Sequence, residues 1–211
     1  MKRLKLVSQL VRYFGINWVI FRVTYVIKVK AGWYKRRFPG VRLDESSLAF
    51  WLKQGIPTAT QGYFDWRHSN RPSFFFDKVP QLPSSDYLIT KAEAILAGCW
   101  TYFQHAEFQI GMPPEWNKNP LTGQMIPIDK HWSEISDFDS GDIKYIWEPN
   151  RFSVVFTLVR AFAVTRDPKF ANAFWALTDD WAIKNPPQMG PNWKCGQEAS
   201  FRVMADRKSV V

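Results

Sequence analysis

The chain has 211 residues and a mass of 24.7 kDa, enough for one large domain or two small ones with a buried core. Its composition, 46% hydrophobic and 17% aromatic with only two cysteines, excludes a disordered chain, a collagen and a disulfide scaffold. The net charge of +9 first suggests a protein that binds polyanions.

The positive charge is concentrated at the N-terminus. Residues 1–43 contain eleven Lys and Arg and no acidic residue, because Asp44 is the first carboxylate of the chain. Residues 44–211 keep 17 basic groups against 19 acidic ones, a net charge of −2. We therefore divide the chain into a basic N-terminal helical segment, residues 1–43, and a nearly neutral body, residues 44–211.

The basic segment fits neither a cleavable signal peptide nor a membrane span. Its apolar run over residues 16–21 ends at Arg22, whereas a signal peptide needs roughly 7 to 15 uninterrupted apolar residues and a small-residue cleavage site. A span over residues 13–29 would carry Arg22 and Lys28, and each charge costs roughly 3 kcal/mol at its centre. Two interpretations stay open. The segment either lies on an anionic membrane surface or packs on the body with solvated basic side chains.

The first half of the body is predicted to be irregular apart from one helix. Four prolines within residues 56–90 indicate an extended, loop-rich stretch. A helix begins at residues 84–86, continues with apolar residues at spacings of three and four, and ends near Gly98 or Trp100. Residues 110–142 combine Pro, Gly and Asn with an acidic cluster, which again predicts loops.

The cysteines and histidines form no recognisable ligand pattern. Cys99 and Cys195 stand alone, and His68, His105 and His131 are scattered along the chain. The sequence therefore predicts no metal site and no cofactor.

The last third of the body predicts a helical hairpin. A first helix runs from residue 149 to residue 164, and the sequence Thr-Arg-Asp-Pro ends it with Asp167 as the N-cap and Pro168 as the first residue of a second helix. Asn-Pro-Pro at 185–187 ends the second helix. The apolar residues that follow helical spacing are Phe152, Val155, Phe156, Val159, Phe162 and Ala163 in the first helix, and Phe170, Phe174, Leu177 and Trp181 in the second. Such hairpins are the building units of helical barrels and solenoids, so the predicted class is all-α, mainly helical.

Several stretches of the body share a distinctive order of residues. They are Trp116 with Asn-Pro-Leu-Thr-Gly (119–123), Gly-Asp-Ile-Lys-Tyr-Ile-Trp-Glu-Pro-Asn-Arg (141–151), the Thr-Arg-Asp-Pro turn, and Asn-Pro-Pro-Gln-Met-Gly-Pro-Asn-Trp-Lys-Cys-Gly-Gln-Glu-Ala-Ser-Phe-Arg (185–202). In this order, with W-E-x-x-R before N-W-x-x-x-x-E-x-x-x-R, they resemble the N-terminal, alginate-lyase-like domain of the heparinase II/III family of polysaccharide lyases. The resemblance covers residues 100–202, about half of the chain.

The resemblance implies a fold and a reaction. The fold is an incomplete α/α toroid of helical hairpins followed by a β-sandwich domain, and the reaction is β-elimination on an acidic, uronate-containing polysaccharide. In the family the catalytic Asn-His and Tyr follow the region that ends here near Arg202, and the sequence then turns to the charged run 204–211. We therefore expect residues 44–211 to be the opening part of a toroid, a truncated lyase with no β-sandwich and no catalytic residue of its own.

The family also suggests where a polysaccharide would bind. The candidate substrate-binding residues are Trp147, Glu148, Arg151, Asn192, Trp193, Glu198 and Arg202. A Trp ring offers a flat apolar face to a pyranose, while Arg and Asn can bind a uronate carboxylate. Alternatively, Glu148 with Arg202, or Arg151 with Glu198, form buried ion pairs between neighbouring hairpins. We favour the structural role for the glutamates and substrate binding for Arg151 and Asn192.

Three hypotheses from different classes follow. The first is the N-terminal portion of a polysaccharide lyase, which the family places in the periplasm or cell envelope. The second is a non-catalytic scaffold that binds an acidic glycan. The third assigns the basic segment to a membrane surface or to nucleic acid, and we exclude nucleic acid because no recognition motif accompanies the charge. The polysaccharide itself stays open among heparan-like glycosaminoglycans, alginate-like polymers and bacterial capsule or exopolysaccharides.

Overall fold

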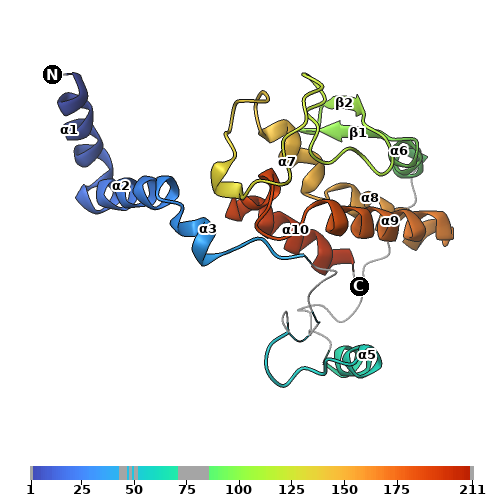
Figure 1. The fold of residues 1–211 in the computed structure, drawn as a ribbon. Helices are drawn as coiled ribbons and strands as arrows, with labels where there is room; N and C mark the ends of the chain where they lie inside the picture. The colour runs from blue at the N-terminus through green and yellow to red at the C-terminus, as the bar shows by residue number, and fades with distance from the viewer. Residues whose placement is uncertain (1, 43–46, 48, 50–51, 71–85, 210–211) are drawn as a thin grey trace.

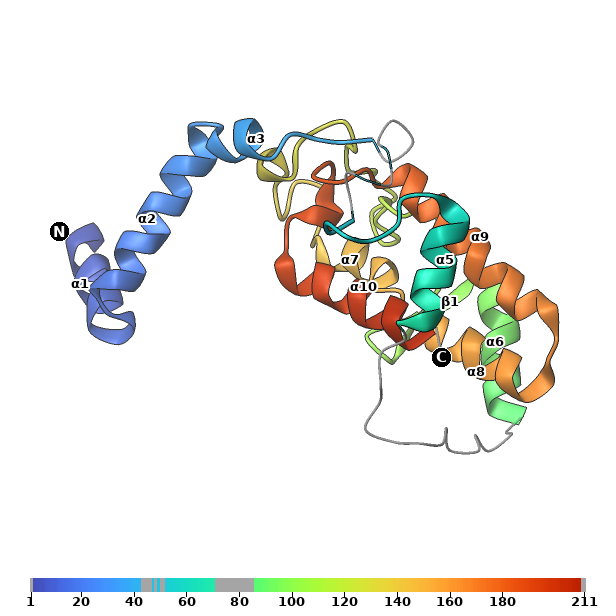
Figure 2. The same ribbon diagram turned by 90° about the horizontal axis from the view of Figure 1, so that it is seen from below.

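The structure is a computed structural model that describes residues 2–42, 47, 49, 52–70 and 86–209. Most of the regular structure is α-helical, with one small two-stranded sheet, so the mainly helical class predicted from the sequence is confirmed. The helices from residue 86 onward, which belong to the body, pack together, and the first two helices of the chain project away from them (Figures 1 and 2).

The basic segment is helical, but it is not one helix. It forms α1 (Lys2–Phe14), α2 (Ile16–Lys30) and the short α3 (Trp33–Arg37). The break between α1 and α2 falls at Gly15, whose φ of 84° lies in the left-handed region that glycine adopts without strain. This single residue turns two apolar stretches into an elbow.

The segment is tied to the body at its end. Tyr34 of α3 packs on Trp132, with ring centroids 5.4 Å apart, and Lys35 pairs with Glu134 at 2.9 Å. The carbonyl of Phe38 accepts a hydrogen bond from His131 at 3.0 Å. These contacts belong to α3 and the chain after it, while α2 contains no buried residue.

The prediction of loops over residues 56–90 is wrong in part. Helix α5 (Thr60–Ser69) lies between Pro57 and Pro72, where no proline interrupts the chain. Within α5, Gln61 donates a hydrogen bond to Asp65 one turn later at 2.9 Å. None of the residues of α5 is buried. Residues 71–85, the remainder of the predicted loop, lie outside the described residues.

Helix α6 (Asp86–Leu96) begins where the sequence predicts and ends earlier. Cys99 and Trp100 instead start strand β1 (Cys99–Tyr102), which pairs antiparallel with β2 (Ala106–Gln109). Gly98 makes this change of direction possible, because its φ is 82° and an added Cβ would lie 2.8 Å from the Cα of Gly111. The short hairpin was missed because four-residue strands give too little alternation to read.

The chain after β2 is irregular, as predicted. Over residues 110–142 its one regular piece is the 3-10 turn η1 (Trp132–Glu134). His131 caps this turn by accepting a hydrogen bond from the Ser133 backbone, and Glu134 reaches back to the His131 backbone at 3.2 Å.

The predicted helical hairpin is present with a different beginning. Helix α7 (Lys144–Asn150) ends before α8 (Val154–Thr165), so Phe152 lies between two helices and not within one. Its φ is 58°, and its ring stacks on Trp116 with centroids 5.4 Å apart. This stacking fixes the break that helical spacing alone does not reveal.

The second half of the hairpin follows the prediction. The Asp167 side chain caps α9 (Pro168–Lys184) by accepting a hydrogen bond from the Lys169 backbone at 3.0 Å, and Pro168 is the first residue. Helices α8 and α9 pack side by side (Figure 1). After the turn η2 (Pro191–Trp193), helix α10 (Gly196–Ser209) packs on α7 and α8. The main core gathers around Trp100, Tyr102, Trp116, Val155, Leu158, Phe170 and Leu177.

Candidate functional site

The seven candidate residues lie in three neighbouring elements and form one group, which we call the motif cluster. Trp147 and Glu148 belong to α7, and Arg151 directly follows that helix. The sequence predicts these three residues at the start of a long helix, whereas the structure places them at the end of a short one. Asn192 and Trp193 belong to η2, and Glu198 and Arg202 lie on α10. The indole nitrogen of Trp147 donates to the carbonyl of Pro191 at 3.0 Å, which joins α7 to η2. Two stretches about forty residues apart in the chain therefore meet.

Arg151 lies at the centre of the motif cluster. Its Nε and Nη2 donate to the two carboxylate oxygens of Glu198 at 2.7 and 2.9 Å, and its Nη1 donates to Glu148. The Glu198 side chain is only 4% exposed. The hydrogen bonds to Glu198 raise the pKa of Arg151, and the charge of Glu148 adds to this effect. The guanidinium thus neutralises two carboxylates that lie on different helices.

The expected ion pairs are found in part. Arg151 and Glu198 pair as the sequence suggested, and the pair is largely buried. Glu148 pairs with Arg151 and not with Arg202, because the two residues are three positions apart at the end of α7. Its other oxygen accepts from the Phe103 backbone at 3.0 Å, so Glu148 also holds the turn between β1 and β2.

Arg202 lies between two aromatic rings. Its guanidinium carbon lies 5.1 Å from the ring centroid of Trp181 and 5.5 Å from that of Trp193, and its Nη2 donates to the carbonyl of Asn192 at 2.6 Å. Burial lowers the pKa of Arg202 to about 10, so the side chain is still protonated at neutral pH. Its Nη1 is buried and has no hydrogen-bond partner within the described residues.

Asn192 is fully buried in a network of asparagines. Its Nδ2 donates to the side-chain oxygens of Asn185 at 2.8 Å and Asn117 at 3.1 Å, and Asn185 donates to the carbonyl of Trp181. The Oδ1 of Asn192 has no partner within the part of the chain that the structure describes. The amide therefore faces other protein groups and not an open surface.

Asn150 and Asn185 are polar residues beside the motif cluster that were not among the predicted site residues. Asn150 donates to the carbonyls of Trp116 and Ile146 at 2.8 and 2.6 Å and accepts from the indole of Trp181 at 2.6 Å. It is completely buried, as are Asn185 and Asn192 to within 2%. Asn185 was interpreted only as part of the Asn-Pro-Pro helix end, and the recurrence of Asn beside Pro or Trp in several segments could have suggested a shared polar core.

His131 and His105 are the histidines whose contacts bear on acid–base chemistry. His131 is buried, its Nε2 bonds to the Phe38 carbonyl and its Nδ1 lies 2.7 Å from the hydroxyl of Ser133. Burial lowers the pKa of His131 and so favours the neutral ring. His105 is exposed and its Nδ1 lies 2.7 Å from the Phe103 carbonyl. Both rings are used in local structure.

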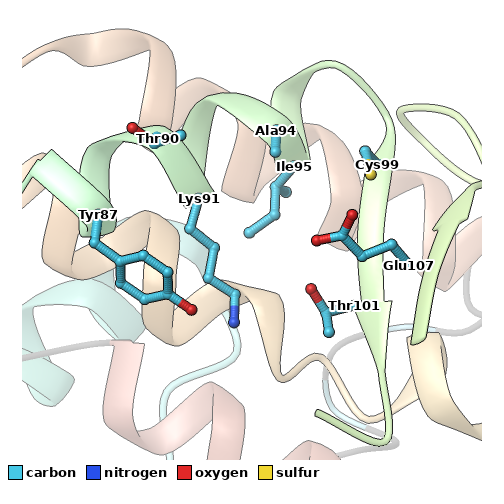
Figure 3. Close-up of a pocket in the computed structure, with 8 residues that line it drawn as sticks. All are labelled: Tyr87, Thr90, Lys91, Ala94, Ile95, Cys99, Thr101 and Glu107. Carbon is cyan, nitrogen blue, oxygen red and sulfur yellow. The ribbon is translucent and has the colours of Figure 1, made fainter. Parts of the chain in front are cut away.

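A shallow hollow lies elsewhere, between α6 and the two strands. Figure 3 shows the ammonium of Lys91 pointing toward its open middle, with Tyr87 on one side and Thr101 and Glu107 on the other. The hollow shares no residue with the motif cluster. The hollow contains a partly buried Lys91, an exposed Glu107 and one partly buried thiol, Cys99, a set that suggests no particular reaction.

Within the described residues, no group of three or more His, Cys, Asp or Glu gathers to hold a metal ion. Both cysteines are free thiols. Comparison of the chain with protein-family models, with curated proteins and with solved structures finds no match.

Proposed function

We propose that this chain is the N-terminal portion of a polysaccharide lyase similar to the heparinase II/III family, and that it binds acidic polysaccharide without cleaving it alone. The observation that carries the proposal is that W-E-x-x-R and N-W-x-x-x-x-E-x-x-x-R, separate in the sequence, meet around Arg151. The two motifs contact each other through the ion-paired Arg151, so they form one structural unit. This agrees with the resemblance, in which both motifs belong to the same domain.

The architecture around the motif cluster supports the proposal. The hairpin of α8 and α9, with α10 packed against α8, is the kind of unit that a toroid repeats. We propose that these helices are the opening hairpins of an incomplete α/α toroid. The short elements α7 and η2 precede α8 and α10, the position in which a toroid places the loops around its cleft.

The chemistry of β-elimination divides the work between groups. The uronate carboxylate must be neutralised, a base must remove the C5 proton, and an acid must protonate the leaving oxygen. The motif cluster offers cationic and aromatic groups, Arg151, Arg202 and Trp193, that suit binding of a uronate ring. The proton carriers of the family lie in the region that follows, so we assign this chain a binding and framework role.

The proposal is tested by binding of uronate polymers to the full chain. Affinity electrophoresis in gels that contain alginate or heparin, with neutral dextran as control, measures binding without requiring activity. We expect Arg202→Gln to lower affinity for alginate or heparin by about tenfold, because one charge-assisted contact is lost. Dextran should not retard the chain.

A matched control separates the motif cluster from the basic segment. Arg22→Gln removes an equal charge from α2 and should change uronate affinity by less than twofold. Equal loss in both variants, or loss in Arg22→Gln alone, contradicts the proposal, since binding would then be a property of net charge. Circular dichroism and the urea unfolding midpoint confirm that each variant is folded.

A non-catalytic glycan-binding scaffold is the second candidate, and the engagement of His131 in capping and backbone contacts favours it. The two candidates differ in one measurement. A longer chain that continues past Val211 should release unsaturated uronate, detected by its ultraviolet absorbance, if the lyase proposal is correct. If that longer chain binds uronate polymers but releases no unsaturated uronate, the non-catalytic scaffold is the correct candidate.

A further inference from the structure

Helix α2 exposes an apolar stripe that nothing in the described structure covers. Ile16, Ile20, Val23 and Ile27 follow one another at spacings of four, three and four, which places them on one face of the helix. Their exposed fractions are 55%, 56%, 53% and 60%. In a soluble domain such a face packs against the core.

Helix α1 repeats the arrangement with a sharper division. Leu6, Val7, Leu10 and Phe14 share one side of the helix by their spacing, and Leu6 and Phe14 are more than half exposed. Ser8, Gln9 and Arg12 lie on the other side and are exposed. The two helices thus present two apolar faces joined at Gly15.

Charge and aromatic rings accompany these faces. The eleven Lys and Arg of residues 1–43 have no acidic neighbour in sequence, while the body carries a slight negative charge. The guanidinium of Arg22 lies over Trp18 and Tyr25, and the ammonium of Lys28 lies 4.7 Å from the ring centroid of Trp33. Aromatic rings next to basic groups are typical of side chains at the headgroup level of a membrane.

We propose that α1 and α2 form a membrane-docking element that lies in the interface of an anionic lipid bilayer. The aliphatic stripe and Phe14 enter the acyl boundary, and the Lys and Arg side chains extend to the lipid phosphates. This inference is independent of the proposed polysaccharide function, because it concerns a different part of the chain.

The other occupants of these faces fit less well. Nucleic acid would use the cations but would leave the aliphatic stripe in water. A second copy of the chain would cover the stripe but would bring two acid-free segments of like charge together. An anionic bilayer offers apolar and negative groups side by side, which matches both features.

The geometry of the elbow suits a helix pair that lies flat. Within the described residues, no single helix is long and apolar enough to cross a membrane, and the pair Leu6–Phe14 and Ile16–Lys30 that reaches the length is bent by 118°. Two helix axes that meet at one point always share a plane, so both can lie in the membrane interface together. Figures 1 and 2 show both helices projecting clear of the body, which leaves the body beside the surface.

The test is co-sedimentation of the full chain with vesicles of phosphatidylcholine, alone or mixed with phosphatidylglycerol. We expect partition into the anionic vesicles only, weakened at high salt. Arg12→Gln with Arg22→Gln should lower the partition coefficient about thirtyfold, and Ile20→Asn with Ile27→Asn more than tenfold.

A control with equal charge loss removes Arg67 and Arg160, exposed residues of α5 and α8, and should change partition less than twofold. Equal partition into neutral vesicles, or no effect of the two double variants in α1 and α2, overturns the proposal. Light scattering adds a second route to rejection: a dimer that the isoleucine variants dissociate would show that the stripe is a contact between copies. Because the substituted side chains are exposed, the unfolding midpoint should be unchanged in every variant.

Discussion

Helices α2 and α8 have similar apolar content but differ in burial. Both are rich in Val and other large apolar residues, with Ile and Phe in α2 and Leu and Phe in α8, and each carries an arginine near its middle. Helix α8 buries Val154, Val155, Leu158 and Ala161 against the core, whereas α2 buries nothing. Apolar content alone therefore does not decide burial. The packing partners decide it, and for α8 they are α9, the next helix in the chain, together with α6 and α10.

The largest expected difference between the two helices is the cost of truncating a side chain. Leu158→Ala in α8 removes a fully buried side chain and should cost about 4 kcal/mol of unfolding free energy. Ile20→Ala in α2 removes a side chain that is 56% exposed and should cost less than about 0.5 kcal/mol. Urea denaturation followed by circular dichroism measures both. Equal costs would mean that α2 packs on the body in solution.

The second prediction concerns the ion pairs that join α7 to α10. Arg151→Ala leaves Glu198 buried without its partner and should cost about 3 kcal/mol. Arg160→Ala, an exposed arginine of α8, is the matched control and should cost less than about 0.5 kcal/mol. Loss of stability with unchanged uronate affinity would assign Arg151 to structure alone, against the binding role that we favour.

The third prediction is a dependence on pH that belongs to the junction between the segment and the body. Because burial lowers the pKa of His131, the folded protein holds the ring neutral while the unfolded chain protonates it near the ordinary value of 6.5. Stability is therefore full above that value and falls as the pH decreases toward the folded pKa. The unfolding free energy between about pH 7.5 and pH 5 measures this.

His131→Gln should flatten the decline in this pH range, and His105→Gln, at an exposed position, should leave it in place. An unchanged slope in His131→Gln would assign the pH dependence to other groups.

The smallest expected effect is at the surface contact between α3 and the body. Lys35 and Glu134 are both about half exposed, so Lys35→Ala should change the unfolding free energy by less than about 0.5 kcal/mol. Arg36→Ala, next to it on α3, is the control. A larger loss in Lys35→Ala would mean that the ion pair, and not the contacts of Tyr34 and His131, holds the segment to the body.

Sequence reasoning succeeded where the signal was local. The cap at Asp167, the first helical residue Pro168 and the mainly helical class follow from spacing and capping rules. It failed where tertiary contacts decide. The break at Phe152 depends on stacking with Trp116, and the ends of α6 depend on Gly98 approaching Gly111.

In the candidate site, too, contacts within the motifs could be predicted from the sequence, and contacts with other segments could not. The pairing of Arg151 with Glu198 could be predicted because each belongs to one of the two motifs that carry the resemblance. The link from Glu148 to the Phe103 backbone could not, since nothing in the sequence relates the two positions. The asparagine network was missed for a similar reason. Asn117, Asn185 and Asn192 are separated by up to 75 residues, and each alone is an ordinary turn residue.

The arrangement around Arg151 has a consequence for synthesis of the chain. Glu198 is added 47 residues after Arg151, so the emerging polypeptide has only Glu148 to neutralise this guanidinium while α8 and α9 are made. The contacts that join α7 to α10 therefore form last, after the helical hairpin has had time to fold. Ribosome-bound chains from which α9 has emerged while α10 is still enclosed by the ribosome should contain the hairpin with Arg151 not yet paired to Glu198.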